Sequence, residues 1–262
     1  MFDASSVWLD TLRRILSSGF EVSPRGRLTK ELLQHTLIIS MRRPVVTVVE
    51  RKLNYQFMAA EAHWILSGDD TVAGIAPWNK NIAQFSDDGE RFFGAYGPKI
   101  VGQLDYVVAK LLADQDTRQA GLTIWRENPP ATKDVPCTVA IFANIRDTTL
   151  NLHVFMRSSD AWLGVPYDVF NFSMLGHLIC CRLNDHHRTG EATVVPGRLY
   201  LTAASSHLYE PNWLPARECL SAVYRSQAPT PQELWAEEKT LYAWLEGLRD
   251  TKPGDRLRWW ES

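Results

Sequence analysis

The sequence predicts one large domain that combines helices and strands, of the α/β or α+β class. Its 262 residues, of which 45% are hydrophobic, are enough to bury one substantial core. Segments with apolar residues at helical spacing alternate with runs rich in β-branched residues, and one pair of runs has the form of a hairpin. We find no internal repeat, low-complexity tract or linker in the sequence, so we expect a single domain over residues 1–262.

Charge and composition argue against several classes of function. The formal net charge of -2 gives no general attraction to nucleic acid, although a few arginines can still hold an anionic small ligand. No run approaches the roughly 18 apolar residues of a membrane span, and the N-terminus has the pattern of an amphipathic helix rather than a signal peptide. We therefore expect a cytoplasmic protein that binds neither nucleic acid nor membrane.

The four cysteines do not have the spacing of a metal site, so we expect free thiols and no bound metal. Cys180 and Cys181 lie in the apolar run 170–183, which indicates buried core residues. Cys137 differs, because it follows Pro136 and precedes a strand-like run. A thiol at the point where a loop enters a sheet can point into a cleft.

The first hundred residues predict helices around one β-branched region. Residues 5–16 have the apolar spacing of one helical face, and residues 55–66 return to this spacing. Between them, residues 32–49 carry β-branched clusters and predict two strands or one bent strand. Residues 69–98 are rich in Gly, Asp and aromatics without periodicity, and so long a loop in a compact domain is more often functional than idle.

The middle of the chain predicts a helix, a loop and a hairpin. Residues 101–112 are a helix candidate, and residues 122–125 a short strand. Residues 128–136 contain three prolines, so they form a loop that delivers Cys137 to the sheet. Two strand-like runs flank the turn at Arg146 and Asp147, which is the strongest hairpin signal in the chain.

The last part of the chain predicts a buried helix, a strand and a second helix. Residues 169–183 are mostly apolar and too long for a typical strand, so we expect a helix. Residues 197–209 predict a final core strand. Residues 231–248 predict a helix with Pro near its start.

Four features supply residues suited to nucleophilic chemistry. They are the post-proline Cys137, the string Arg157–Asp160, the string His207–Tyr209, and Glu61 on an apolar helix. Taken alone, a cysteine at a strand start is more often structural, and an Arg-Ser-Ser-Asp string is usually a solvated turn. Together they supply a thiol, a guanidinium, hydroxyls and a carboxylate, which suit nucleophilic attack on an anionic substrate.

In order and spacing, these and neighbouring motifs resemble the thymidylate synthase family. The resemblance covers roughly residues 5–215, including the pyrimidine-binding half and the helix with the catalytic glutamate. It implies that family's α+β fold in three layers, with a mixed twisted sheet flanked by helices and packed across a dimer interface. The matching motifs are Glu61–Gly68, Trp78, Phe93–Gly97, Asp134–Cys137, Arg157–Asp168 and Ser206–Tyr209.

The resemblance implies covalent catalysis on a pyrimidine nucleotide. Cys137 would add to C6 of the ring, and C5 would then take a one-carbon unit from 5,10-methylenetetrahydrofolate. Arg157 would lie beside the thiol, lower its pKa and bind the substrate phosphate.

Arg25 matches a second phosphate ligand, and Arg118 matches one that the partner subunit donates, which implies a homodimer. Taken alone, each of these two arginines reads equally well as a solvated surface charge. Gln119 departs from the family, which usually has a second arginine there, so the phosphate grip at that point is in doubt.

Other positions carry over from the matching motifs. His207 and Tyr209 match ligands of the sugar 3'-hydroxyl, although His207 also reads as a satisfied core histidine. The remaining assignments are Ser158 and Ser159 to the substrate, Tyr96 to catalysis, and Trp78, Asp160 and Gly164 to folate.

Asp168 separates this sequence from thymidylate synthases. They have an asparagine there, whose amide can accept from N3 and donate to O4 of uracil. A carboxyl group suits cytosine, because it accepts from the exocyclic amino group and can share a proton with N3. Asp168 thus resembles the deoxycytidylate hydroxymethylase branch, in which water instead of hydride adds to the exocyclic methylene. The alternative is that Asp168 caps a helix that begins near Val169.

Two further features bear on this chemistry. Glu61, a carboxylate on a mostly apolar helix, is expected to have a raised pKa and to organise the water network. The family closes over folate with an apolar C-terminal tail. This chain instead ends in Arg-Trp-Trp-Glu-Ser, with Trp259 and Trp260, so closure over folate would be built differently.

The choice of sugar rests on the resemblance. The sequence looks closest to the CMP hydroxymethylases of nucleoside-antibiotic pathways, such as the mildiomycin type, in which a lysine before the cysteine lies near the substrate. Lys133 occupies that position, although a mobile loop lysine is the alternative. We expect CMP as the preferred substrate and dCMP next. The competing hypotheses are an atypical thymidylate or UMP methylating enzyme, and a catalytically silent nucleotide- or RNA-binding relative.

Overall fold

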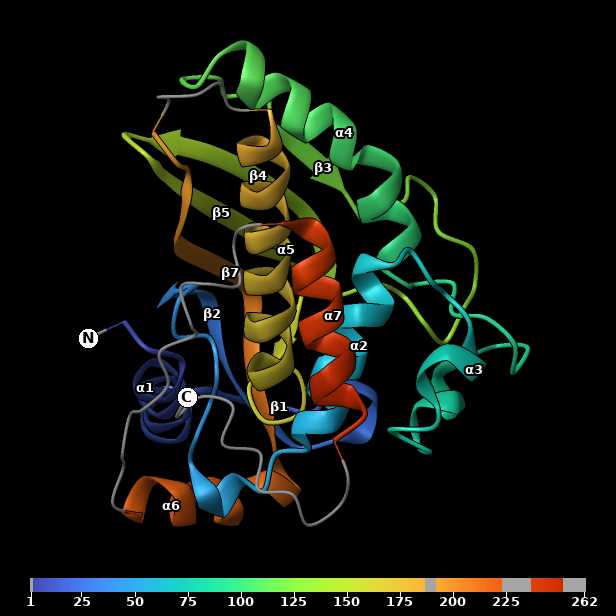
Figure 1. The fold of residues 1–262 in the computed structure, drawn as a ribbon. Helices are drawn as coiled ribbons and strands as arrows, with labels where there is room; N and C mark the ends of the chain where they lie inside the picture. Colours follow the sequence, from blue (N-terminus) through green and yellow to red (C-terminus); the bar gives the residue numbers. More distant parts are fainter. Residues whose placement is uncertain (1, 187–191, 223–236, 252–262) are drawn as a thin grey trace.

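A mixed sheet forms the centre of the molecule in the computed structural model, which describes residues 2–186, 192–222 and 237–251 (Figure 1). In these residues the sheet has seven strands in the order β1-β2-β7-β5-β4-β3, with β6 paired to β7. The β5–β7 and β6–β7 pairs are parallel and the others antiparallel. The strands are β1 Phe20–Val22, β2 Thr29–Ser40, β3 Gly121–Thr123, β4 Thr138–Arg146, β5 Thr149–Met156, β6 Ser159–Asp160 and β7 Val195–Tyr209.

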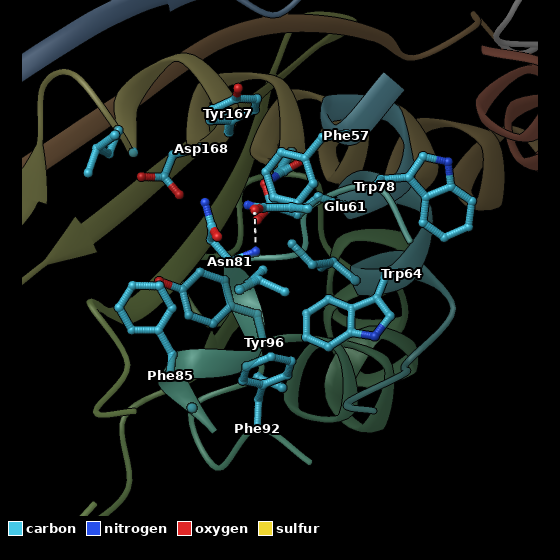
Figure 2. A pocket seen from close by; sticks show the side chains of 18 of the residues that line it. Phe57, Glu61, Trp64, Trp78, Asn81, Phe85, Phe92, Tyr96, Tyr167 and Asp168 are labelled. Carbon is cyan, nitrogen blue, oxygen red and sulfur yellow. Dashed lines mark hydrogen bonds between the residues drawn. The ribbon is translucent and has the colours of Figure 1, made fainter. Parts of the chain in front are cut away.

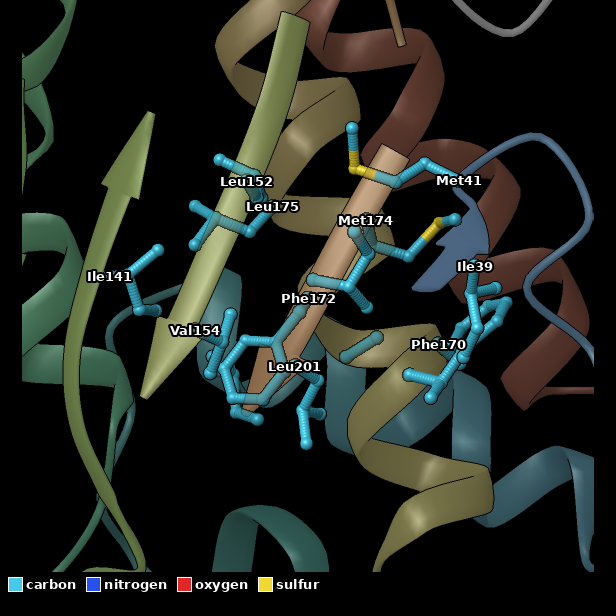
Figure 3. Close-up of a cluster of buried hydrophobic side chains, with 14 of the residues drawn as sticks. Ile39, Met41, Ile141, Leu152, Val154, Phe170, Phe172, Met174, Leu175 and Leu201 are labelled. Carbon is cyan, nitrogen blue, oxygen red and sulfur yellow. The ribbon is translucent and has the colours of Figure 1, made fainter. Parts of the chain in front are cut away.

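Helices flank this sheet, and α5 crosses its centre with α7 and α2 beside it (Figure 1). The core lies between α5 and the sheet, where Phe172 and Leu175 of α5 meet Leu152, Val154 and Leu201 of β5 and β7 (Figure 3). These side chains are at most 2% exposed. The helices are α1 Ala4–Ser18, α2 Tyr55–Leu66, α3 Val72–Ile75, α4 Gly97–Ala113, α5 Val165–Asp185, α6 Trp213–Ser221 and α7 Glu238–Arg249.

Most elements lie where the sequence predicts them, and the α+β class with a mixed sheet flanked by helices is confirmed. The helix expected at 55–66 is α2, and the expected hairpin is β4 and β5. Its turn lies one residue later than expected, because Arg146 pairs with Thr149 and Asp147 adopts a left-handed φ of 54°. Cys180 and Cys181 are fully buried thiols, as expected.

The prediction of strand structure as far as residue 49 is wrong, because β2 ends at Ser40. Residues 44–48 form no strand. Pro44 has no N–H to give a sheet, and the N–H of Thr47 donates to the Ser5 hydroxyl of α1 at 2.9 Å. The valines of this segment are buried in the core all the same, so its apolar character reflects packing and not strand pairing.

Two helix boundaries also bear on the predictions. Helix α5 begins at Val165 with Gly164 as its N-cap, so Asp168 lies inside the first turn and the capping alternative is wrong. Helix α7 accounts for the end of the helix expected at 231–248, whereas residues 231–236 lie outside the described residues. Trp259 and Trp260 also lie outside them.

One face of the hairpin is open. Phe142 and Phe155, on β4 and β5, are 42% and 44% exposed, and their rings lie 6.4 Å apart. Their strand neighbours Ile141 and Val154 point the other way into the core, as the two-residue period of a strand requires. In the parts of the chain that the structure describes, no helix is both long and apolar enough to cross a membrane.

Candidate active site

A cleft of about 680 Å³ opens between α2, the loop that follows it and the start of α5. Figure 2 shows Glu61, Asp168 and Tyr96 around one space in this cleft, with the ring of Trp64 on its wall. The volume is in the range of small-molecule sites. Its aromatic residues are Phe57, Trp64, Trp78, Phe85, Phe92, Tyr96 and Tyr167. Its charged residues are Arg51, Glu61, Asp134 and Asp168.

Two carboxyl groups line the cleft from different helices. Glu61 comes from the middle of α2, and Asp168 from the first turn of α5. Burial raises the pKa of Glu61 to about 7, against a hydrogen bond at 2.7 Å that the Asn171 amide donates to Glu61 Oε2. Burial, followed by the charges of Glu61 and Asp160, raises the pKa of Asp168 to about 8. The two groups can therefore hold and move protons near neutral pH.

Cys137 lies between the proline-rich loop and β4, partly buried. The backbone N–H of Arg157 donates to the Cys137 carbonyl at 2.9 Å. The guanidinium of Arg157 donates to the carbonyls of Pro136 and Val135 at 3.0 and 2.8 Å, which holds this loop against the end of β5. Burial raises the pKa of the Cys137 thiol, and the Arg157 charge acts in the opposite direction. The expected cation is thus in place, but burial outweighs it.

Tyr96 lines the cleft and is close enough to Asp168 and Cys137 for their charges to act on it. Its hydroxyl accepts a hydrogen bond from the N–H of Thr138, the residue after Cys137, at 3.3 Å. Its ring stacks on Phe172 of α5, with centroids 6.2 Å apart. Burial, with the charges of Asp168 and Cys137, holds the pKa of Tyr96 well above its ordinary value, so the hydroxyl stays protonated as a donor.

Two carboxylates attach the loop before Cys137 to the loop after α3. Asp134 accepts from the N–H of Gly94 at 2.7 Å. Asp87 accepts from the N–H of Lys133 at 3.0 Å and also from the Thr132 hydroxyl. The side chain of Lys133 is exposed, so its backbone is fixed while its ammonium group is free to reach a ligand.

A second group of expected residues gathers where β6 pairs with β7. Ser158 Oγ lies 3.5 Å from His207 Nδ1, and the rings of His207 and Tyr209 are 5.1 Å apart. The guanidinium of Arg27 stacks over Tyr209 at 4.4 Å. His207 is buried, with 8% of its surface exposed. Of the two serines, Ser158 is partly exposed and Ser159 is only 1% exposed, so Ser158 is the more accessible.

Arg25 and Arg118 are not among the described residues that line the cleft, and neither are Cys137 and Arg157. Arg25 is exposed in a turn, with a left-handed φ of 53°. Arg118 is exposed in a hollow of the open hairpin face that also contains Phe142 and Phe155. The Gln119 side chain accepts from the ammonium group of Lys110 at 3.1 Å.

Of the three residues assigned to folate, two line the cleft and one does not. Trp78 and Gly164 line the cleft. A side-chain carbon at Gly164 would lie 3.1 Å from Asp168 Oδ2, so glycine permits the close approach of this carboxyl group. Asp160 does not line the cleft, and its Oδ1 accepts from the N–H groups of Trp162 and Leu163 at 2.8 and 3.0 Å.

Sequence reasoning missed Asn171 and Asp134 as cleft residues. Asn171 lies three positions after Asp168 and therefore on the same helical face. This spacing is the signal in the sequence that could have identified it. Asp134 is part of a recognised motif, but its contact with Gly94 connects segments 40 residues apart. Among the described residues, no group of three or more His, Cys, Asp or Glu side chains lies together as metal ligands would.

The fold and the cleft together have the parts of an enzyme that uses a covalent nucleophile, namely a thiol and acids able to move protons beside it. Comparison with known families narrows this class. The family description "Thymidylate synthase" matches residues 6–244, and the chain belongs to this family.

One curated relative is a deoxyuridylate hydroxymethyltransferase from Bacillus phage SP01. It is 33% identical to this chain over an alignment of 184 residues, and the match covers 61% of this chain and 47% of the relative. The chain thus spans about half the length of this relative.

Proposed function

We propose that this protein is a folate-dependent 5-hydroxymethyltransferase of a cytosine nucleotide, with CMP preferred and dCMP the next substrate. The observation that carries the proposal is the position of Asp168, which lines the cleft together with Glu61 and has its pKa raised to about 8. A carboxyl group that keeps its proton at neutral pH can donate to cytosine N3 through one oxygen and accept from the 4-amino group through the other.

The nucleotide would lie between the cleft and the β6–β7 junction. Arg157 and Arg25 of one subunit would bind its phosphate, and Lys133 would add a cation from the loop before the cysteine. His207 and Tyr209 would bind the sugar. Ser158 and Ser159 would complete this half of the site. The arrangement of Cys137 beside Arg157, with Ser158 beside His207, supports this orientation.

The aromatic part of the cleft fits a folate. A pterin ring is planar and apolar on its faces, and it matches walls of tryptophan and phenylalanine rings around a volume of about 680 Å³. Trp78 and Gly164 would hold it from the cleft wall, and Asp160, which does not line the cleft, would reach it from outside that wall. When bound, 5,10-methylenetetrahydrofolate would supply the one-carbon unit that C5 of the pyrimidine receives.

Cys137, Tyr96 and Glu61 would serve the steps at the ring. The Cys137 thiolate adds to C6, which makes C5 nucleophilic. One-carbon transfer would leave an exocyclic methylene once C5 gives its proton to water and the bond from the new carbon to the folate nitrogen breaks with the amine as leaving group. The oxygen of a second water molecule then bonds to the methylene carbon, and Glu61 takes one proton from that water. The electrons of the exocyclic double bond re-form C5=C6 while the C6–S bond breaks, which returns Cys137 as thiolate. Tyr96, protonated beside Asp168, donates hydrogen bonds and holds this arrangement.

We also propose a homodimer through the open hairpin face. Exposed Phe142 and Phe155 there form an apolar surface of the kind that interfaces use. Arg118 shares a hollow with them instead of lining its own subunit's cleft. A guanidinium on such an interface can reach the phosphate bound by the partner.

A uracil nucleotide is the second candidate, because the curated relative is named a deoxyuridylate hydroxymethyltransferase. A protonated carboxyl group can also accept from uracil N3–H and donate to O4. Methylation of uracil, as in a thymidylate synthase, would instead consume folate as a reductant and release dihydrofolate. A catalytically silent relative would bind nucleotide and turn nothing over.

Incubation of the full chain with CMP, dCMP or dUMP, methylenetetrahydrofolate and ¹⁸O-water tests these candidates together. We expect ¹⁸O-labelled 5-hydroxymethyl-CMP, a slower reaction with dCMP, and no rise in dihydrofolate absorbance. Cys137→Ala should lose exchange of the C5 hydrogen of CMP. A preference for dUMP would transfer the proposal to uracil, a 5-methyl product would contradict hydroxymethylation, and no exchange by the wild type would favour the silent relative.

A further inference from the structure

Asn171 contacts Glu61 from inside the core. Its side chain is 5% exposed, on the α5 face that carries Asp168 one turn earlier. Its Nδ2 donates to Glu61 Oε2 at 2.7 Å, a length typical of a charge-assisted bond. Because an ionised carboxylate accepts and cannot donate, this contact favours the ionised form of Glu61.

The other end of the Asn171 amide is unsatisfied. Its Oδ1 is buried and meets no hydrogen-bond donor among the residues that the structure describes. A buried acceptor without a partner destabilises a fold, so an apolar side chain of similar shape would suit this position better on stability alone. Residues that lower stability in a cleft are characteristic of a functional role.

We propose that Asn171 is a positioning residue that holds Glu61 as an oriented carboxylate, ready to take the proton from the attacking water. The proposal deepens the function proposed above and rests on it. Water can add to the exocyclic methylene only if a base receives its proton, and Asn171 opposes the tendency of the buried carboxyl group to stay protonated. The earlier steps at C6 and C5 do not need this water.

Asn171→Leu tests the role against a matched asparagine of the same helix. Asn184 donates to the Val194 carbonyl at 3.0 Å and accepts from the Val194 N–H at 2.9 Å, so it is satisfied at both ends and structural. We expect Asn171→Leu to keep or raise the melting temperature, and Asn184→Leu to lower it.

The activity readouts of the same variants separate positioning from packing. In Asn171→Leu we expect the acidic limb of the pH profile to move up by about one pH unit. Release of the C5 hydrogen should exceed formation of hydroxymethyl product, with the excess methylene trapped by an added thiol. Asn184→Leu should show the wild-type limb and the wild-type product ratio. A lower melting temperature of Asn171→Leu with an unchanged pH limb and product ratio would overturn the proposal.

A measurement without turnover keeps this inference separate from the proposed function. The carboxyl ¹³C signal of Glu61, assigned with Glu61→Gln, gives its pKa in the wild type and in Asn171→Leu. A higher pKa in Asn171→Leu supports the role of Asn171, and an unchanged pKa refutes it. Wild-type protein that makes no hydroxymethyl nucleotide would overturn the proposed function alone, since the titration still decides what Asn171 does.

Discussion

Glu61 and Asp168 are the side chains whose protonation the proposed reaction needs in opposite forms. Glu61 takes a proton from water and must be ionised, which requires a pH above its pKa of about 7. Asp168 gives a proton to the base and must be protonated, which requires a pH below its pKa of about 8. We therefore expect kcat/KM to rise up to a pH between these values. Above it, loss of the Asp168 proton opposes the gain in Cys137 thiolate, whose pKa burial raises, so the profile stops rising. A profile that keeps rising beyond pH 9 would contradict this.

Asp168→Asn should change which base is accepted. The amide keeps the shape of the side chain and can still hydrogen-bond the base, but it cannot transfer a proton to cytosine N3 as the thiolate adds to C6, so stabilisation of the transition state is lost. We expect the ratio of kcat/KM for CMP over dUMP to fall by about 10- to 100-fold, and kcat/KM to keep rising with pH where the wild-type profile stops. Asp185→Asn, at the exposed end of the same helix, should leave both unchanged.

The sequence predicted most residues of the candidate site, but it did not predict their pKa values or their long-range contacts. The order of motifs led to Cys137, Glu61 and Asp168 because these side chains follow recognisable local patterns. The net upward shift of the Cys137 pKa depends on burial by distant segments, which no local pattern contains. The spacing of three residues from Asp168 could have placed Asn171 on the same face of the helix. Its contact with Glu61, however, joins residues 110 positions apart, which no local pattern predicts.

The loop that carries the thiol depends on one glycine. A side-chain carbon at Gly94 would overlap the carbonyl oxygen of Asp134, which belongs to the backbone and cannot turn away. Gly94→Ala should therefore displace the loop before Cys137, lower kcat at least tenfold and reduce the free energy of unfolding by about 1–3 kcal/mol.

Gly102→Ala in α4 is the control for Gly94→Ala, because a carbon there meets nothing within 4 Å. It should raise stability by up to about 1 kcal/mol and leave activity unchanged. Urea unfolding and initial rates measure both variants, and equal effects of the two would refute the steric argument.

Helix α7 supports the cleft from behind. The Tyr242 hydroxyl donates to the Leu66 carbonyl of α2 at 2.7 Å, and Trp78 Nε1 donates to the Arg249 carbonyl at 3.3 Å. The guanidinium of Arg249 lies 5.3 Å from the Trp78 ring centre. Arg249→Ala should raise KM for the folate several-fold with little change in KM for CMP, whereas Lys239→Ala at the exposed start of α7 should change neither.

Elements with local signals were predicted well, and elements defined by partners were not. The mostly apolar helical run of α2 and the alternation in β4 and β5 are properties of the segments themselves. Residues 44–48 have the composition of a strand but pair with no strand in the part of the chain that the structure describes. Sequence periodicity describes what a segment can do, and only the assembled sheet decides whether it becomes a strand.

In the proposed dimer, each active site is completed by Arg118 of the partner subunit, so activity requires two chains. Phe142→Asp should convert the dimer to a monomer and abolish activity, which sedimentation and rate measurements will show. Arg118→Ala and Cys137→Ala should each be inactive as dimers, and mixing them should restore part of the activity, because some mixed dimers contain one site with both residues. Failure of the mixture to recover activity would exclude a shared site.

The buried carboxyl pair also ties protonation to folding itself. In the unfolded chain Glu61 and Asp168 ionise near pH 4.5 and 3.8, whereas their folded pKa values are about 7 and 8. The native chain therefore binds protons that the denatured chain releases, and this pair's contribution to stability, complete below about pH 4, declines as the solution becomes more alkaline up to about pH 8. Asp168→Asn removes the larger part of this linkage, because the pKa of Asp168 rises from 3.8 to about 8 and that of Glu61 from 4.5 to about 7. Its unfolding free energy should therefore vary less steeply with pH than that of the parent. The two acids that serve the proposed chemistry would thus lower the free energy of unfolding of the native protein as the pH rises to about 8.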